Sequence, residues 1–167
     1  MTLYAENETD VKFSFDYEAV ARSVIDATLE AENCPYVCTI NLLITDNQGI
    51  REFNKNFRNL DKETDVLSFP NLDFEEPSDF SKVEEKEADY FDPDSGELIL
   101  GDVIISADKV REQAKAYAHE EKREFAFLVA HSMLHLCGYD HMVDEERLVM
   151  EDKQEKILQG LGITRQG

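Results

Sequence analysis

The spacing of apolar residues predicts a helix, a strand and a second helix in the first third of the chain. Asp16 can cap a helix that runs to about Glu32, since apolar residues follow it at helical spacing. That stripe consists of Tyr17, Val20, Ala21 and Val24. Alternation at Cys38, Ile40, Leu42 and Ile44 then predicts a short strand. Asp46 can cap a second helix, whose core-facing residues are expected to be Ile50, Phe53 and Phe57.

The remaining apolar segments predict two more strands and three more helices. TDVLSFP (64–70) and LILGDVIIS (98–106) have the composition and bounds of strands and are expected to pair. Ser106 can cap a helix whose inward residues would be Val110, Ala114, Tyr117 and Ala118. Residues 122–137 are apolar on almost every helical face, which predicts a helix in the centre of the domain. A last helix, 144–159, should place Val143, Met150, Ile157 and Leu161 near one side.

These elements predict a single α/β domain over residues 1–167, without an internal repeat. No stretch reaches the roughly eighteen consecutive apolar residues of a membrane-spanning helix. The start, MTLYAENETD, lacks the basic and apolar regions of a signal peptide. The three cysteines form no C-x-x-C pair, so buried thiols are expected rather than a disulfide framework. We therefore expect a cytoplasmic protein that does not enter a membrane.

The charge is strongly negative but unevenly distributed. The formal net charge of −20 argues against tight nonspecific binding to nucleic acid. Residues 71–97 hold eleven acidic residues against Lys82 and Lys86. This acidic segment contains turn formers and no apolar period, which predicts a long surface loop or a partly disordered insertion. A docking surface for a basic partner is the alternative interpretation. One local exception is a basic ridge of Arg51, Lys55 and Arg58 at helical spacing.

The stretch HSMLHLCGYDH, residues 131–141, holds three of the four histidines. His131 and His135 are four apart on the predicted central helix, so both lie on one face, as two ligands of one metal require. Gly138 can end the helix in a left-handed conformation and let His141 fold back toward them. The ligand spacing is that of the long zinc motif of metzincin peptidases. Three imidazoles without a fixed fourth protein ligand predict a catalytic zinc site.

Other interpretations of these residues remain open. A closed structural zinc site would need a fourth ligand, for which Cys137 and Asp140 are nearest, although Cys137 points off the ligand face. Zinc peptidases have a glutamate base after the first histidine, but Ser132 stands there and a hydroxyl is no base near neutral pH. Asp140 can orient a ligand, replace that base or simply stabilise the turn.

HSMLHLCGYDH together with TDVLSFP, LGDVIIS and a helix carrying Arg58 resembles the YbeY family of metal-dependent endoribonucleases. The resemblance implies an α/β fold with a small mixed sheet and a zinc site made by His131, His135 and His141. It implies that Arg58 faces the metal cleft and contributes to activity. The family usually has Gly where Ser132 stands, and residues 71–97 are longer than its pattern leads us to expect.

The resemblance also implies a function, namely single-strand-specific cleavage of RNA in ribosomal RNA processing and ribosome quality control. His131 would then serve catalysis as a metal ligand, Ser132 and Asp140 would lie just behind the ligands, and Arg51 and Lys55 would guide the RNA backbone. Three imidazoles also accept divalent transition metals other than zinc. Ribosomal or ribosome-maturation proteins are candidate partners of the acidic segment. A metzincin-like peptidase and a noncatalytic ribosome-assembly factor with a structural metal are the rival hypotheses.

Overall fold

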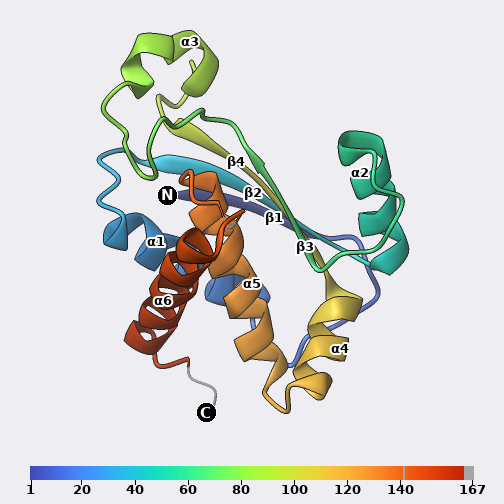
Figure 1. Cartoon of the computed structure of the whole chain (residues 1–167). Helices are drawn as coiled ribbons and strands as arrows, with labels where there is room; N and C mark the ends of the chain where they lie inside the picture. Colours follow the sequence, from blue (N-terminus) through green and yellow to red (C-terminus); the bar gives the residue numbers. More distant parts are fainter. Residues whose placement is uncertain (141, 164–167) are drawn as a thin grey trace.

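A computed structural model describes residues 1–140 and 142–163 of the chain. Figure 1 shows a curved sheet with helices packed against it. Its strands are β1 (Thr2–Asn7), β2 (Cys38–Thr45), β3 (Val66–Pro70) and β4 (Leu98–Ser106). Its helices are α1 (Tyr17–Ala31), α2 (Asn47–Arg58), α3 (Glu87–Tyr90), α4 (Ala107–Ala116), α5 (Glu121–Leu136) and α6 (Asp144–Gly160), with a 3-10 turn η1 at Val83–Lys86. None of the helices in these described ranges is long and apolar enough to cross a membrane.

The four strands form one mixed sheet in the order β1-β2-β4-β3. β1 and β4 both run parallel to β2, whereas β3 runs antiparallel to β4. The mixed α/β fold is therefore confirmed, and so is the pairing of residues 64–70 with 98–106. β1 was not predicted from the sequence. It is an edge strand whose register is set by pairing with β2, and TLYAEN by itself has no run of apolar residues.

The larger core lies between one face of the sheet and the helices α1, α4, α5 and α6. Alternate residues of a strand point to opposite faces, so Ile40, Leu42 and Ile44 of β2 and Val103 and Ile105 of β4 enter this core. α5 contacts β3, β4, α1, α4 and α6. Its buried residues lie on every side of the helix, which confirms the prediction of a central helix over 122–137.

On the opposite face of the sheet, α2 packs over β3 and β4. Ile50 of α2 packs there with Leu67 of β3 and Ile104 of β4 in a small second core, and Phe53 borders it. Phe57 is 68% exposed, so the prediction that it faces a core is wrong. Its ring lies at the rim of this smaller core.

The predicted helix starts are confirmed where a side chain caps the helix. Asp16 accepts a hydrogen bond from the amide of Ala19, Asp46 from that of Gly49, and Ser106 from that of Lys109. Two side-chain placements are wrong. α4 ends at Ala116 and left-handed Ala118 turns the chain, so Tyr117, which is 65% exposed, and Ala118 both lie at the surface instead of facing inward. In the last helix, Met150 and Ile157 are buried, whereas Val143 precedes α6 and is 55% exposed.

The acidic segment, residues 71–97, is packed onto the domain rather than forming a loose surface loop. It contains η1 and α3, and four of its residues join the larger core: Leu72, Phe80, Val83 and Tyr90. Asn71 extends the β3–β4 pairing by donating its backbone N–H to the carbonyl of Leu100 at 3.0 Å. The segment is therefore a mostly irregular and exposed stretch that these residues anchor to the core. Its apolar residues are spaced to fit the edge of the core and follow neither helical nor strand periodicity.

Candidate metal centre

The last two turns of α5 bring His131 and His135 together, as their spacing predicts. The Nε2 atoms of the two rings are 3.1 Å apart, and the ring planes are inclined at 79° with centroids 4.6 Å apart. Both residues are half-buried. Two zinc ligands at 2.0–2.1 Å in tetrahedral geometry are about 3.3 Å apart, so the observed separation of the nitrogens is close to that of a metal pair.

The turn after α5 fixes the orientation of His135. Its Nδ1 lies 2.9 Å from the backbone carbonyl oxygen of Tyr139. Because a carbonyl only accepts hydrogen bonds, Nδ1 carries the proton and donates it. The lone pair of a neutral ring is then on Nε2, the atom that faces His131. A histidine ligand usually has this arrangement, in which a backbone carbonyl or carboxylate holds the nitrogen remote from the metal.

The third predicted ligand, His141, lies outside the described residues. Within residues 1–140 and 142–163, no group of three or more His, Cys, Asp or Glu side chains is placed to hold a metal ion. The described part of the site thus supplies two imidazoles in a geometry that fits zinc. The ligand set of His131, His135 and His141 stays a prediction.

The acidic segment supports the turn that follows α5. Gly138 ends the helix with a φ of 96°, as predicted, and a β-carbon there would lie 2.8 Å from the side chain of Phe74. The backbone N–H of Ser78 donates to the carbonyl of Cys137 at 2.7 Å. Residues 74–78 therefore pack directly behind the histidine-bearing turn.

A buried carboxylate connects this turn to three other parts of the fold. Glu32, just after α1, is 6% exposed and accepts hydrogen bonds from Ser78 Oγ at 2.7 Å and Lys153 Nζ at 3.1 Å. The Tyr139 hydroxyl is its third donor. Burial raises the pKa of Glu32, but the hydrogen bonds from Tyr139, Ser78 and Lys153 outweigh burial and lower the pKa below its ordinary value.

Sequence reasoning missed this network. Glu32, Ser78 and Lys153 are far apart in the chain and belong to no motif, and Tyr139 occupies a position of the histidine stretch that is not part of its ligand spacing. Burial and mutual hydrogen bonding are visible only once the chain is folded. Tyr139 is the link to the site, since its hydroxyl donates to Glu32 while its carbonyl holds His135.

The two predicted neighbours of the ligands have different environments. Ser132 is fully buried, and its Oγ lies 2.6 Å from Ser68 Oγ of β3. Its hydroxyl therefore joins α5 to the sheet. Asp140 is exposed at the end of the described turn. Their predicted role behind the ligands stays a prediction.

The basic ridge is on α2, across β3 from the histidines. β3 is an edge strand whose Leu67 packs against α2 and whose Ser68 bonds to α5, so the two helices flank it on opposite sides. Arg58, the last residue of α2, is exposed, and left-handed Asn59 follows it. Lys55 is exposed as well, and Arg51 Nε donates to Asp61 Oδ1 at 2.8 Å. The predicted role of Arg58 in a metal cleft is untested by this geometry.

Comparison with known proteins gives the same family over nearly the whole chain. A family model described as Endoribonuclease YbeY matches residues 3–162. Relatives named Endoribonuclease YbeY include those of Agathobacter rectalis and Lachnoclostridium phytofermentans, 57% and 56% identical over 165 residues, which are 99% of this chain and the whole of each relative. A Clostridium botulinum relative of the same name is 41% identical, with 98% of this chain and 99% of the relative covered.

A solved structure has a similar fold. The solution structure of TM1509 from Thermotoga maritima matches with a TM-score of 0.54 at 20% sequence identity. The match covers 96% of this chain and 91% of the other. At this identity the likeness supports the arrangement of the sheet and helices, and nothing further about the site.

Proposed function

The chain belongs to the YbeY endoribonuclease family, and on that premise we propose that it cuts single-stranded regions of ribosomal RNA in ribosome maturation and quality control. The observation that supports this most directly is the pair of imidazoles on α5. Their Nε2 atoms face each other at 3.1 Å, and the Tyr139 carbonyl holds the proton of His135 on Nδ1. Both features favour a divalent metal as the centre of the chemistry.

In this proposal His131, His135 and His141 hold one zinc ion. When bound, it supplies a Lewis acid suited to the negative charge that develops in phosphodiester cleavage. His135 keeps its lone pair on Nε2, the atom that faces His131, because the Tyr139 carbonyl accepts from its Nδ1. The burial of the rest of α5 fixes the helix that carries both rings. Imidazoles also accept nickel, cobalt or copper, so zinc is the proposal rather than a consequence of the ligand types.

Arg58 contributes a planar guanidinium that can make two hydrogen bonds to one phosphate group. Because α2 and α5 flank β3, an RNA strand that crosses this edge of the sheet can reach Arg58 and the histidines together. Arg51 and Lys55 extend the positive charge along α2 and are proposed to guide the RNA backbone. Arg51 must exchange its partner Asp61 for a phosphate to do so. This local charge offsets the repulsion between RNA and a protein of net charge −20.

The two rival functions are less favoured. A metzincin-like peptidase needs a glutamate base after the first histidine, whereas Ser132 is buried and bonded to Ser68. A noncatalytic assembly factor would use the metal only to hold the turn after α5. That turn also has contacts with the acidic segment and, through Tyr139, with Glu32, so these contacts contribute to holding it independently of a metal.

The partners and location complete the proposal. Ribosomal RNA is the substrate. The acidic segment, residues 71–97, is proposed to contact basic ribosomal or ribosome-maturation proteins, because its exposed carboxylates complement their charge. The cytoplasmic location expected from the sequence belongs to the same proposal.

The test is cleavage of a labelled single-stranded ribosomal RNA fragment by the wild-type protein, His135→Ala and Arg58→Ala, with bound metal quantified in each. His135→Ala should lose both metal and cleavage. Arg58→Ala should keep its metal and cleave about 10²–10³-fold more slowly, the usual effect of removing one group that stabilises transition-state charge. Arg22→Ala, an exposed arginine of α1, is the matched control and should behave as wild type.

Two results would count against the proposal. Cleavage that persists in His135→Ala would indicate a contaminating nuclease or a site elsewhere. Unchanged cleavage by Arg58→Ala would remove this arginine from the mechanism and leave the metal proposal standing.

A further inference from the structure

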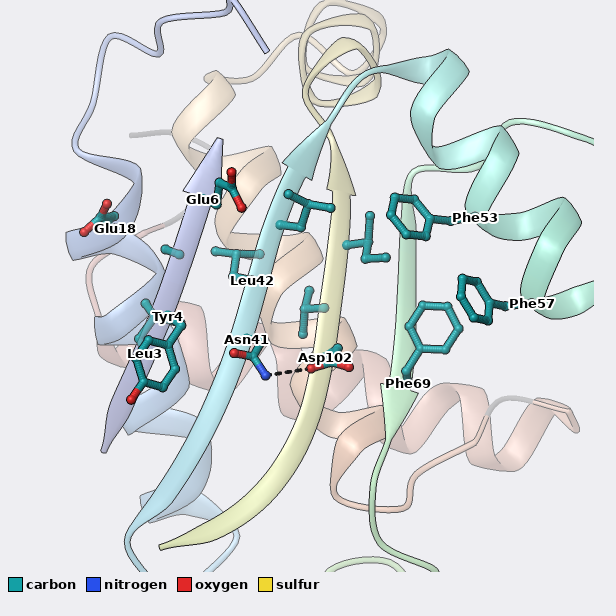
Figure 2. A pocket seen from close by; sticks show the side chains of 14 residues that line it. Leu3, Tyr4, Glu6, Glu18, Asn41, Leu42, Phe53, Phe57, Phe69 and Asp102 are labelled. Atoms are coloured by element: carbon teal, nitrogen blue, oxygen red, sulfur yellow. Dashed lines mark hydrogen bonds between the residues drawn. The ribbon is translucent and has the colours of Figure 1, made fainter. Parts of the chain in front are cut away.

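The face of the sheet opposite α5 carries a broad groove of about 980 Å³ beside α2. Figure 2 shows Phe53 and Phe57 of α2 next to Phe69 of β3 at one side, and Tyr4 of β1 at the other. The rings of Phe53 and Phe57 are stacked with centroids 6.1 Å apart, and Phe57 meets Phe69 edge-on at 5.7 Å. Phe57 and Tyr4 are 68% and 63% exposed. The groove therefore presents aromatic surface to the solvent.

This face of the sheet is only partly covered by the protein's own helices. α2 packs on β3 and β4, whereas Tyr4 of β1 is 63% exposed and Asn41 of β2 is exposed on this side. Leu43 of β2, which points to this face, consequently lines the groove instead of being fully buried. The uncovered part of this face combines apolar side chains, such as Leu43 and the phenylalanines of α2, with the polar side chains of Glu6, Asn41 and Asp102. It is therefore suited to a partner that has both an apolar and a polar face.

The charges of the groove are all negative. Glu6, Glu18 and Asp102 line it, together with neutral residues. Within residues 1–140 and 142–163, no cation forms an ion pair with any of the three, and Asp102 accepts a hydrogen bond from Asn41 at 2.8 Å. Three carboxylates without a lining cation repel the phosphates of RNA. They also disfavour a second copy of this chain, whose net charge is −20.

We propose that this groove binds an amphipathic helix of a partner protein, with apolar side chains on the aromatic floor and Lys or Arg residues facing the three carboxylates. Helix-in-groove binding uses apolar anchors at helical spacing, and the flanking charges select the partner. β2 has eight residues, so the sheet is about 26 Å long under the groove. A helix of roughly 17 residues spans that length. This surface is separate from the metal centre and from the acidic segment, and the proposal does not depend on the RNA cleavage.

The test uses a fluorescent peptide of roughly 17 residues with Leu on one helical face and Lys on both flanks. A matched peptide has Glu at every Lys position. Fluorescence anisotropy gives the Kd of each for the full chain and its variants. The Lys peptide should bind, with a Kd that rises with salt, and the Glu peptide should bind at least about tenfold more weakly.

Variants of the groove separate its apolar and charged contributions. Phe57→Ser removes an exposed ring and should raise the Kd of the Lys peptide about tenfold or more, because exposed aromatic anchors dominate such interfaces. The double variant Glu6→Gln and Glu18→Gln should raise the Kd less and flatten its salt dependence. Leu148→Ser is the matched control, since Leu148 is 58% exposed on α6, across the sheet from the groove.

Several outcomes would overturn the proposal. Equal binding of both peptides, or an unchanged Kd for Phe57→Ser, would show that the groove does not recognise a basic amphipathic helix. A single-stranded RNA oligonucleotide that displaces the Lys peptide from wild type but not from Phe57→Ser would make the groove an RNA surface. Sedimentation that shows a wild-type dimer lost in Phe57→Ser would assign the groove to a second copy.

Discussion

Replacing Glu32 with Ala should weaken both the fold and the metal centre, because one carboxylate joins four parts of the structure. The substitution leaves Ser78 Oγ and the Tyr139 hydroxyl without their acceptor, whereas Lys153, with a side chain 34% exposed, can turn to water. Hydrogen bonds to a charged group contribute about 1.5–3 kcal/mol each and are not additive. With Lys153 regaining hydration, we expect a loss of about 2–3 kcal/mol in the free energy of unfolding.

Urea denaturation of metal-free protein measures this loss without the metal. A competition titration with a zinc chelator then measures the effect on the site. The Tyr139 carbonyl that holds His135 should be less well placed in Glu32→Ala, and zinc affinity should fall about tenfold, as for other residues that orient a ligand. Glu32→Gln keeps one acceptor oxygen. Its stability and zinc affinity should therefore lie between those of wild type and Glu32→Ala. The control is Glu30→Ala, since Glu30 is an exposed residue in the last turn of α1, two positions before Glu32.

The same prediction has a defined pH dependence. The pKa of Glu32 is lower in the folded protein than its ordinary value of 4.5, so the ionised carboxylate stabilises the fold above that pH. This stabilisation is lost as the pH falls through the lowered pKa. The difference in stability between wild type and Glu32→Ala should therefore shrink below pH 4.5. A loss below about 0.5 kcal/mol at neutral pH is no larger than the effect of an ordinary surface substitution. Such a result would refute the reasoning.

Three further variants or probes test other contacts. Ser132→Gly removes the hydrogen bond to Ser68 and should cost about 1 kcal/mol in urea denaturation, plus the helix penalty of glycine, with metal content unchanged. Gly138→Ala puts a β-carbon at positive φ against Phe74 and should lower stability by about 1–2 kcal/mol or more; a neutral result would mean that the turn can move. The hydrogen bond with Cys38 lowers the pKa of Cys34 to about 7. Iodoacetamide should therefore label half-buried Cys34 before the two buried thiols, at a rate that rises through pH 7. Equal labelling of the three cysteines in mass spectrometry would contradict this.

The sequence alone predicts the position of an element correctly where its local apolar pattern agrees with its environment in the folded domain. α5 is apolar on all sides because it is surrounded, and β4 (Leu98–Ser106) has the bounds predicted for it. β1 escaped prediction because only pairing with β2 makes it a strand. Phe57 was wrongly predicted to be buried. Helical periodicity shows that it shares a face with Ile50 and Phe53, but not that α2 extends beyond the small core at this end. The acidic composition of residues 71–97 hid four residues that reach the core.

For the candidate site, the predictable part is the part with a fixed spacing. A spacing of four positions on a helix places the side chains of His131 and His135 next to each other, so their approach follows from the sequence alone. The positive φ of Gly138 follows in the same way from its place after the helix. Glu32, Ser78 and Lys153 meet only because α1, the acidic segment and α6 converge on one turn. No local pattern encodes that convergence.

The central claim is that RNA cleavage depends on a metal held by the histidines of residues 131–141. The most direct measurement strips the purified protein with a chelator, adds zinc back in steps, and follows cleavage of a single-stranded ribosomal RNA fragment. The account predicts no cleavage without metal, and recovery that is complete at one zinc per chain in wild type and absent in His131→Ala. Full cleavage by the metal-free protein, or equal recovery in His131→Ala, would contradict it.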